Sequence, residues 1–195
     1  EKILQLPRYT ELGELPGHQG FPGGTTLCPT DPRSIKLIEE LYAEYAPLFE
    51  ATDFNIMCDE PWELGKGRSA ARARRIGVGR LYVEFIKKLD RLCRRHGKRT
   101  NMWTDVVLAH PESLSELPRD IVMLNWTYAL GSPLIKRTAE IVRNGFPVVV
   151  CPGTHGWNSH GCRLDTGMRN IAEFTAEGLR RGAEGLLNTD WGDNG

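Results

Sequence analysis

Several absences narrow the functions open to this chain of 195 residues. Basic and acidic residues balance at 25 each, so overall charge does not favour a nucleic-acid or membrane partner. No apolar run is long enough to span a bilayer, and the first residues lack a signal-peptide pattern. The five cysteines are odd in number and irregularly spaced, which predicts buried free thiols rather than a disulfide framework.

The sequence also lacks a glycine-rich phosphate loop between a strand and a helix. Gly65-Lys66-Gly67-Arg68 is similar in composition but has neither nucleotide-binding spacing. This absence argues against a nucleotide-binding open sheet. The composition, 40% hydrophobic and 26% charged, is that of a globular protein, and the length suits one domain over residues 1–195.

Short apolar runs alternate with amphipathic segments along the chain. Strands are predicted at 53–57, 100–103, 121–126, 147–151 and 184–189, with a weaker one near 2–6. Helices are predicted after Asp31-Pro32, across 81–93, from Ser132-Pro133 to Asn144, and from Asp165 or Thr166 to Gly182, with a shorter one after Pro111. Such alternation indicates an α/β fold with parallel strands and helical crossovers.

The residues that follow the predicted strands favour a barrel over an open sheet. Five successive strand ends carry aromatics, carboxylates or both: Cys58-Asp59-Glu60, Trp103-Thr104-Asp105, Trp126-Thr127-Tyr128, Thr154-His155-Gly156-Trp157 and Asp190-Trp191-Gly192-Asp193. In a (β/α)8 TIM barrel these ends converge on one face, where active sites lie. A complete barrel needs about 250 residues. With about six strands, we expect an incomplete barrel whose first two strands are missing.

Tryptophans near four strand ends, together with Tyr128, favour a carbohydrate ligand. The apolar faces of a sugar ring stack on aromatic side chains, although large aromatics also fill barrel cores. The adjacent Asp59 and Glu60 repel each other when both are ionised, which raises the pKa of one, and partial burial raises it further. A carboxyl group that stays protonated near neutral pH can act as a general acid.

Two segments carry a more specific pattern, one before the first predicted helix and one after it. They are Cys28-Pro29-Thr30-Asp31-Pro32-Arg33-Ser34 and Phe54-Asn55-Ile56-Met57-Cys58-Asp59-Glu60-Pro61. Together they resemble glycoside hydrolase family 20, the β-N-acetylhexosaminidases. The family's fourth barrel strand ends in Gly-Asp-Glu, often preceded by His-Ile-Gly. Here Met57 and Cys58 replace the two glycines.

Other motifs extend the resemblance over nearly the whole chain. Met102-Trp103-Thr104-Asp105 is similar to the family's Trp-x-Asp on the fifth strand, and Trp126 to its sixth-strand tryptophan. Trp191-Gly192-Asp193 is similar to the Trp-x-Glu after the last strand. Pro16-Gly17-His18 is similar to a Pro-Gly-His after the third strand, with Glu14 in place of the usual Asp.

The resemblance implies a hydrolase that removes N-acetylhexosamine by substrate-assisted, retaining hydrolysis. The sugar's own 2-acetamido oxygen would attack the anomeric carbon while Asp59 orients the acetamido group. Glu60 would protonate the leaving oxygen and then activate water, with His18 supporting Glu60 through a hydrogen-bond relay. The expected substrate contacts are His18, Trp103, Asp105, Trp126, Tyr128, Trp157, Trp191 and Asp193. No metal or other cofactor is implied.

Three alternatives stay open on the sequence alone. Cys151, His155, His160 and Cys162 are zinc-type ligands after a strand, although their spacing fits no standard site. Glu60 with Asp190 or Asp193 would serve a conventional retaining glycosidase. The aromatic strand ends alone would serve a non-catalytic carbohydrate-binding barrel. We also expect weak or absent activity from these 195 residues alone, because an incomplete barrel exposes strand edges.

Overall fold

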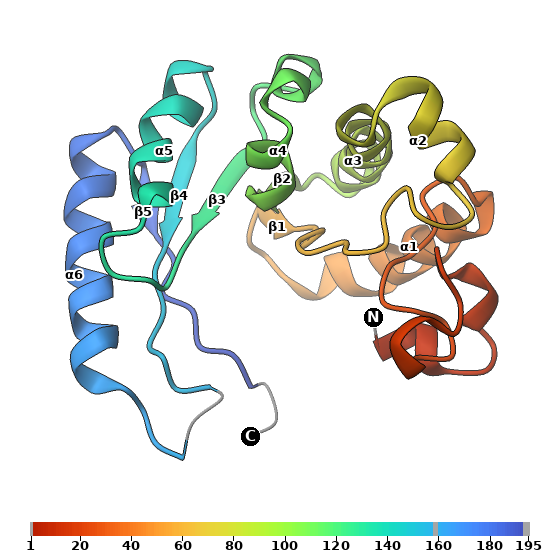
Figure 1. The fold of residues 1–195 in the computed structure, drawn as a ribbon. Helices are drawn as coiled ribbons and strands as arrows, with labels where there is room; N and C mark the ends of the chain where they lie inside the picture. The colour runs from red at the N-terminus through yellow and green to blue at the C-terminus, as the bar shows by residue number, and fades with distance from the viewer. Residues whose placement is uncertain (1, 158–159, 193–195) are drawn as a thin grey trace. The chain divides into compact units, whose positions relative to one another are not determined.

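The computed structural model describes residues 2–157 and 160–192 (Figure 1). Its strands are β1 (Asp53–Asn55), β2 (Arg99–Trp103), β3 (Val122–Trp126), β4 (Val148–Cys151) and β5 (Gly185–Leu186), and their order in the sheet is the order in the chain. Its α-helices are α1 (Pro32–Tyr45), α2 (Ala70–Ile76), α3 (Val78–Arg95), α4 (Asp105–Ala109), α5 (Pro133–Arg143) and α6 (Leu164–Arg180). The α/β class is therefore confirmed.

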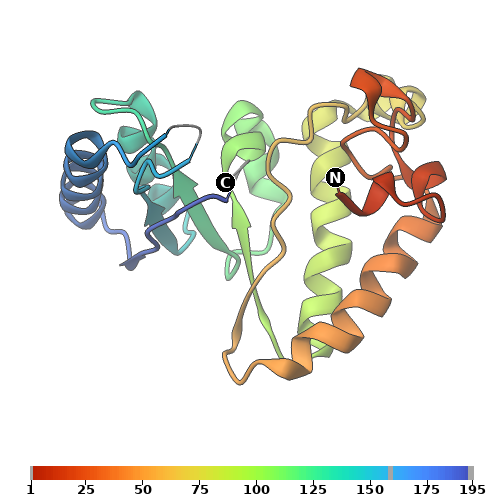
Figure 2. The same ribbon diagram turned by 90° about the horizontal axis from the view of Figure 1, so that it is seen from below.

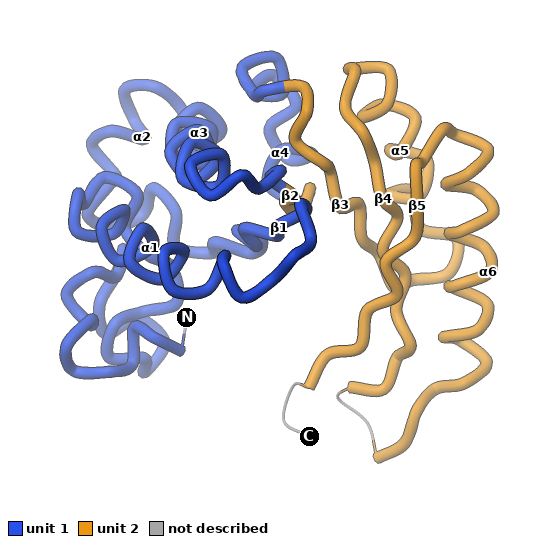
Figure 3. Tube along the Cα trace, turned by 180° about the vertical axis from the view of Figure 1, so that it is seen from behind, with its two compact units in different colours: residues 1–100, 106–118 blue, residues 101–105, 119–195 orange. Residues whose placement is uncertain are grey.

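The chain forms two compact units, coloured separately in Figure 3. Unit 1 comprises Glu1–Thr100 and Val106–Pro118, and unit 2 comprises Asn101–Asp105 and Arg119–Gly195. Asp59 and Glu60 belong to unit 1, whereas the predicted tryptophan contacts belong to unit 2.

Unit 1 is built on two long helices that lie side by side, α1 and α3 (Figures 1 and 2). The predicted start of α1 is confirmed, because the Asp31 carboxylate accepts a hydrogen bond from the Arg33 backbone N–H at 2.9 Å and Pro32 occupies the first turn. Along α3, apolar residues at helical spacing are buried: Leu81, Tyr82, Ile86, Leu89, Leu92 and Cys93. They form much of the core of this unit.

Unit 2 holds a parallel sheet with helices on one face. β2 pairs with β3, β3 with β4, and β4 with β5, all in parallel. α5 and α6 pack on β3 and β4 (Figure 1). Because side chains alternate along a strand, Val150 packs toward the helices with Ile135 and Phe174, while its neighbour Cys151 packs with Trp103 on the other face. Trp103, Trp126 and Trp191, which pack with Cys151, therefore lie on the face away from the helices.

Several predicted boundaries need correction. The weak strand near 2–6 is wrong: Lys2–Gln5 is a 3-10 helix, whose Leu4 is buried against Leu12 and Leu37. The described residues therefore hold five strands rather than about six. α6 begins at Leu164, before the predicted caps, and Asp165 lies in its first turn instead. The segment after Pro111 is a 3-10 helix that ends at Glu116.

Within the described residues, no helix has the length and apolar character needed to cross a membrane.

Candidate active site

The acidic pair lies on a sharply turned loop that follows β1. The strand ends at Asn55, two residues earlier than predicted, because the Asn55 side chain accepts a hydrogen bond from the Met57 backbone N–H at 2.8 Å. Met57, Cys58 and Glu60 then adopt left-handed backbone conformations, with φ of 61°, 67° and 46°. Such conformations cost a residue with a side chain about 1–2 kcal/mol each. This strain is concentrated around Asp59.

One hydrogen bond and the surrounding burial define the environment of the pair. The Tyr82 hydroxyl, on α3, donates a hydrogen bond to the Cys58 carbonyl at 2.9 Å and so anchors the loop to the helix. Asp59 is half-buried, and this burial raises the pKa of its carboxyl above the usual range. Glu60 is exposed. The two neighbouring carboxyls therefore differ in hydration, as two groups with different chemical tasks require.

A cavity of about 460 Å³ opens beside the pair, entirely within unit 1. Asp59 and Glu60 line it together with Met57 and Cys58 of the same loop. Most of the remaining wall is apolar and comes from the 25–29 segment, α1 and α3, including Leu27, Ile38, Leu41, Tyr42, Phe85 and Leu89. The size is that of a typical small-molecule pocket.

His18 is joined to a carboxylate that sequence analysis did not single out. Its Nδ1 lies 2.8 Å from Oε1 of Glu63, which has no solvent exposure. The other Glu63 oxygen accepts the backbone N–H groups of Thr25 and Thr26 at 3.0 and 3.1 Å. Gly24 permits this approach, because a Cβ there would lie 2.6 Å from Glu63 Oε2. The expected relay partner of His18 was Glu60; the observed partner is Glu63.

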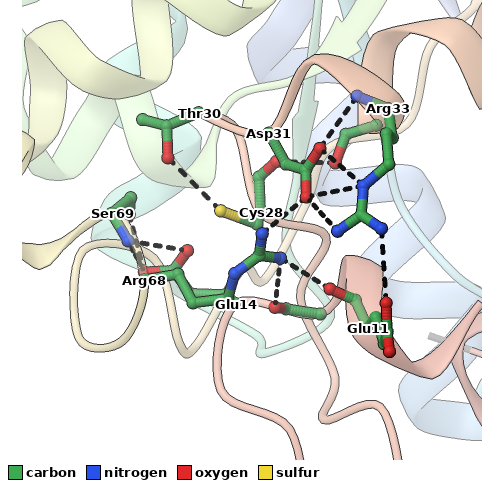
Figure 4. A network of polar contacts seen from close by, with 10 residues as sticks. Glu11, Glu14, Cys28, Thr30, Asp31, Arg33, Arg68 and Ser69 are labelled. Carbon is green, nitrogen blue, oxygen red and sulfur yellow. Dashed lines mark hydrogen bonds and ion pairs between the residues drawn. The ribbon is translucent and has the colours of Figure 1, made fainter.

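A second buried carboxylate explains the glycine-rich segment at 65–68. Glu14 has no solvent exposure, and its carboxylate accepts hydrogen bonds from the backbone N–H groups of Gly67 and Ser69 and from the Ser69 hydroxyl (Figure 4). Backbone N–H groups of this segment therefore bind a carboxyl side chain of the same chain.

Arg68 extends the same network to the start of α1 (Figure 4). Its guanidinium contacts Asp31 Oδ2 at 2.5 Å and donates to the Glu11 carbonyl at 2.6 Å. Arg33 also pairs with Asp31, and these hydrogen bonds, Arg33 first and then Arg68, hold the pKa of the Asp31 carboxyl well below its usual range. The network fixes the segment that carries Glu14 to the loop that carries Glu63.

In unit 2, aromatic side chains from four strand ends meet around Tyr128. The Trp191 indole N–H donates a hydrogen bond to the Tyr128 hydroxyl at 2.7 Å. The Tyr128 ring lies 5.3 Å from Trp126 and 4.8 Å from Trp157, and Trp103 contacts Trp191 at 5.9 Å, all measured between ring centroids. The structure thus brings together five of the predicted sugar contacts.

The loop after β4 completes this aromatic cluster. The His155 ring stacks on Trp157 at 5.4 Å with 15° between the planes, and its Nε2 lies 2.7 Å from the Tyr128 carbonyl oxygen. The Thr154 hydroxyl donates to Asp190 at 2.7 Å. Gly153 is required for this packing, because a Cβ there would lie 2.5 Å from Trp157 and 2.8 Å from Tyr128.

The remaining predicted residues are placed as follows. Trp103 is 3% exposed, and its indole N–H has no hydrogen-bond partner among the described protein atoms. Asp105 is the first residue of α4. Asp193 lies outside the described residues. Within residues 2–157 and 160–192, no group of three or more His, Cys, Asp or Glu is arranged to hold a metal; Cys151 is buried and Cys162 contacts the Thr154 carbonyl.

Comparison with known proteins identifies the family of this chain. The model of glycosyl hydrolase family 20, catalytic domain, matches residues 15–169 of the 195. This chain belongs to glycosyl hydrolase family 20. The family predicted from the sequence is therefore confirmed. No curated protein matches the chain.

Solved structures show the family 20 fold at low sequence identity. Flavobacterium johnsoniae chitobiase gives a TM-score of 0.60 at 20% identity over 85% of this chain and 26% of its own. The Streptomyces coelicolor A3(2) GH20 β-N-acetylhexosaminidase gives a TM-score of 0.57 at 15% identity, over 92% of this chain and 37% of its own. The Bacteroides fragilis NCTC 9343 β-N-acetylhexosaminidase gives a TM-score of 0.56 at 17% identity, over 75% of this chain and 30% of its own.

These likenesses establish the fold and the extent of the match. The chain has the fold of part of a (β/α) barrel, as predicted from the aromatic and acidic residues at its strand ends. It spans between 26% and 37% of the length of these three structures.

Proposed function

We propose that the chain carries the reacting carboxylates of a β-N-acetylhexosaminidase that works by substrate-assisted retaining hydrolysis. The observation that carries the proposal is the position of Asp59-Glu60: a strained loop at the carboxyl end of β1, beside a cavity, in a chain of family 20. Strain of this kind persists at functional sites when the surrounding structure holds it in place. Here the Tyr82 hydrogen bond contributes to that hold.

Asp59 is suited to orient the sugar's 2-acetamido group. Its carboxylate is half-buried, and burial disfavours its charged form, as the raised pKa records. Because water has limited access to the half-buried Asp59 carboxylate, the amide N–H of the sugar can donate the hydrogen bond that water would otherwise donate. When the acetamido oxygen attacks the anomeric carbon, positive charge develops on the oxazolinium nitrogen, and a nearby carboxylate stabilises that charge.

Glu60 is suited to proton transfer. It is exposed and lines the same cavity, so a leaving-group oxygen and an incoming water can both reach it. It would protonate the departing oxygen in the first step. As a carboxylate, it would then take a proton from the water that opens the oxazolinium ring and restores the free sugar.

The aromatic side chains of unit 2 are proposed as sugar contacts. Trp126 and Trp191, both half-buried, would offer apolar ring faces, and the buried Trp103 would support Trp191, which it contacts. The Tyr128 hydroxyl, oriented by Trp191, would hydrogen-bond the acetamido carbonyl. Asp105, Trp157 and Asp193 are proposed as further sugar contacts. A glycan containing N-acetylhexosamine is the proposed ligand; family 20 relatives named as chitobiase and β-N-acetylhexosaminidase support this class.

Release of 4-nitrophenol from the β-N-acetylglucosaminide and β-N-acetylgalactosaminide tests this proposal. We expect turnover by a complete barrel that includes these residues, and a fall in its kcat of about 10²–10⁴-fold in Glu60→Gln, the range for loss of a general acid–base group. Ligand binding should persist, since Gln keeps the shape of the side chain. Glu44→Gln, at an exposed position of α1, is the matched control and should keep full activity. Binding without turnover would instead identify a carbohydrate-binding barrel.

A further inference from the structure

His155 has no part in the proposed function, although it contacts two members of the aromatic cluster of unit 2. It lies in the loop after β4, which also carries Trp157. On the sequence alone it is a candidate zinc ligand, but no group of potential metal ligands forms around it in the described part of the chain. Its contacts instead join this loop to Tyr128, at the end of β3.

The His155 side chain is bonded to the backbone of Tyr128. Its Nε2 lies 2.7 Å from the Tyr128 carbonyl oxygen. Because a carbonyl oxygen only accepts hydrogen bonds, this nitrogen carries a proton in the contact, as it can in the neutral and in the charged ring. The Tyr128 hydroxyl accepts a hydrogen bond from the Trp191 indole N–H at 2.7 Å. Tyr128 is therefore held at its backbone by one loop and at its hydroxyl by another.

The same imidazole also packs on the neighbouring aromatic rings. It stacks on Trp157 with ring centroids 5.4 Å apart and 15° between the planes. It meets the Tyr128 ring edge-on at 6.1 Å, and Tyr128 meets Trp157 at 4.8 Å. The three rings contact one another pairwise, so loss of the imidazole removes part of the packing of both others.

The backbone at His155 adopts a conformation that its local sequence disfavours. Its φ is 59°, in the left-handed region, which residues with a side chain seldom occupy. The loop is anchored on both sides of this turn: the Gly153 N–H donates to Asn170 Oδ1 at 3.0 Å, and the Arg163 N–H donates to the His155 carbonyl at 3.3 Å. Such conformations persist where tertiary contacts maintain them, and they are frequent at functional sites. The contacts of the imidazole are among those that maintain this one.

We propose that His155 is a positioning residue, which places the Tyr128 hydroxyl for its hydrogen bond to the acetamido carbonyl of the sugar. The inference rests on the proposed function, in which that hydroxyl donates to the carbonyl. The carbonyl oxygen is the nucleophile of the substrate-assisted reaction. A hydroxyl displaced by about 1 Å would therefore weaken binding and also misalign the attacking atom. His155 acts through Tyr128 and does not itself contact the sugar.

A double-mutant cycle with Tyr128→Phe, in a complete barrel that includes these residues, tests the inference. His155→Phe keeps a ring that can stack on Trp157 but loses the N–H donor. It should lower kcat/KM for 4-nitrophenyl β-N-acetylglucosaminide about tenfold, as loss of one hydrogen bond does. In the Tyr128→Phe background the same change should cost less than about twofold, because the hydroxyl on which it acts is absent. His160→Phe, at an exposed position of the same loop, is the matched control and should change neither value.

Two further measurements keep the test decisive if a variant folds poorly or turns over slowly. His155→Asn suits the left-handed backbone but lacks the ring, so it should also lower kcat/KM by about tenfold or more. The Kd of free N-acetylglucosamine, followed by tryptophan fluorescence, should show the same dependence of the His155→Phe effect on the Tyr128 hydroxyl.

The outcomes separate this inference from the proposed function. An equal loss from His155→Phe in both backgrounds overturns the inference, because the effect then does not pass through the Tyr128 hydroxyl. Full activity of both His155 variants overturns it as well, and each result leaves the proposed function standing. Absence of turnover by the parent barrel, with the expected cycle in Kd, overturns the proposed function alone. Absence of both overturns both.

Discussion

Nδ1 of His18 lies 2.8 Å from Oε1 of Glu63, a carboxylate with no solvent exposure. The other oxygen of Glu63 holds the backbone of Thr25 and Thr26, which border the cavity beside the acidic pair. One buried side chain therefore ties the Pro-Gly-His segment to the wall of the proposed active site.

Replacing Glu63 by Ala should lower the free energy of unfolding by about 3–5 kcal/mol, because it leaves two backbone N–H groups and His18 without their buried acceptor. Glu63→Gln keeps one acceptor oxygen and should cost less. Urea denaturation measures both values. Glu44→Ala, at an exposed site on α1, is the control and should stay within about 0.5 kcal/mol of the parent. Equal stability of Glu63→Ala and the control would refute the anchoring role.

Asp59→Asn should make the protein more stable at neutral pH while abolishing the proposed hydrolysis. Burial raises the pKa of Asp59 in the folded state, so the folded protein binds this proton more tightly than the unfolded chain does. Stability contributed by this group is therefore highest below the ordinary carboxyl pKa and falls as pH rises through the raised value. In Asp59→Asn, this fall in stability with rising pH should be absent. Melting temperatures from pH 3 to pH 8 measure it, and an unchanged pH profile would argue against a desolvated Asp59.

Met57→Gly should leave stability unchanged or raise it by up to about 1 kcal/mol, because glycine removes the left-handed strain at φ 61° but adds unfolded-state entropy. Met57→Val should lower stability by about 1–2 kcal/mol, since a β-branched residue tolerates this conformation poorly. Met168, an exposed methionine on α6, is the matched control, and its change to Gly should cost about 1 kcal/mol. Urea denaturation midpoints measure these changes in stability. If Met57→Gly lowers stability as much as Met168→Gly does, the backbone at Met57 is not strained.

Gly153→Ala should displace Trp157 and Tyr128 and raise KM for an N-acetylhexosaminide, because its Cβ would lie 2.5 Å and 2.8 Å from their rings. Overpacking of this kind costs about 1–3 kcal/mol. Gly161→Ala, in the same loop with no atom within 4 Å of the added Cβ, should change neither quantity. Near-ultraviolet circular dichroism reports the aromatic packing independently of turnover. Identical spectra for both variants would contradict the proposed packing.

Local signals in the sequence predicted much of the fold. Asp31 and Pro32 fix the start of α1 through a cap two residues away, and the apolar spacing of α3 needs no distant partner. The aromatic strand ends predicted which side chains gather in unit 2. The strand predicted near residue 2 failed because the same apolar spacing also suits a short helix whose Leu4 meets Leu37, a contact that local sequence does not reveal.

The buried carboxylates lay beyond local prediction. His18 and Glu63 are 45 residues apart, and Glu14 meets Ser69 across 55 residues, so only the tertiary fold brings them together. The turn at Met57 and Cys58 had a signal of another kind. The family motif has glycine at both positions, and Met57 and Cys58 both have positive φ here. Glycine in the motif therefore indicates a left-handed backbone conformation, which Met57 and Cys58 adopt with strain.

The most direct test of substrate assistance compares kcat/KM for 4-nitrophenyl β-N-acetylglucosaminide and 4-nitrophenyl β-glucoside. The glucoside lacks the acetamido oxygen, so it loses an intramolecular nucleophile whose effective molarity can reach about 10⁵ M or more. We predict turnover of the first substrate and at least about 10³-fold slower turnover of the second. Comparable rates on both would contradict the mechanism and assign the reaction to a protein nucleophile, with Asp190 and Asp193 as the residues to replace next.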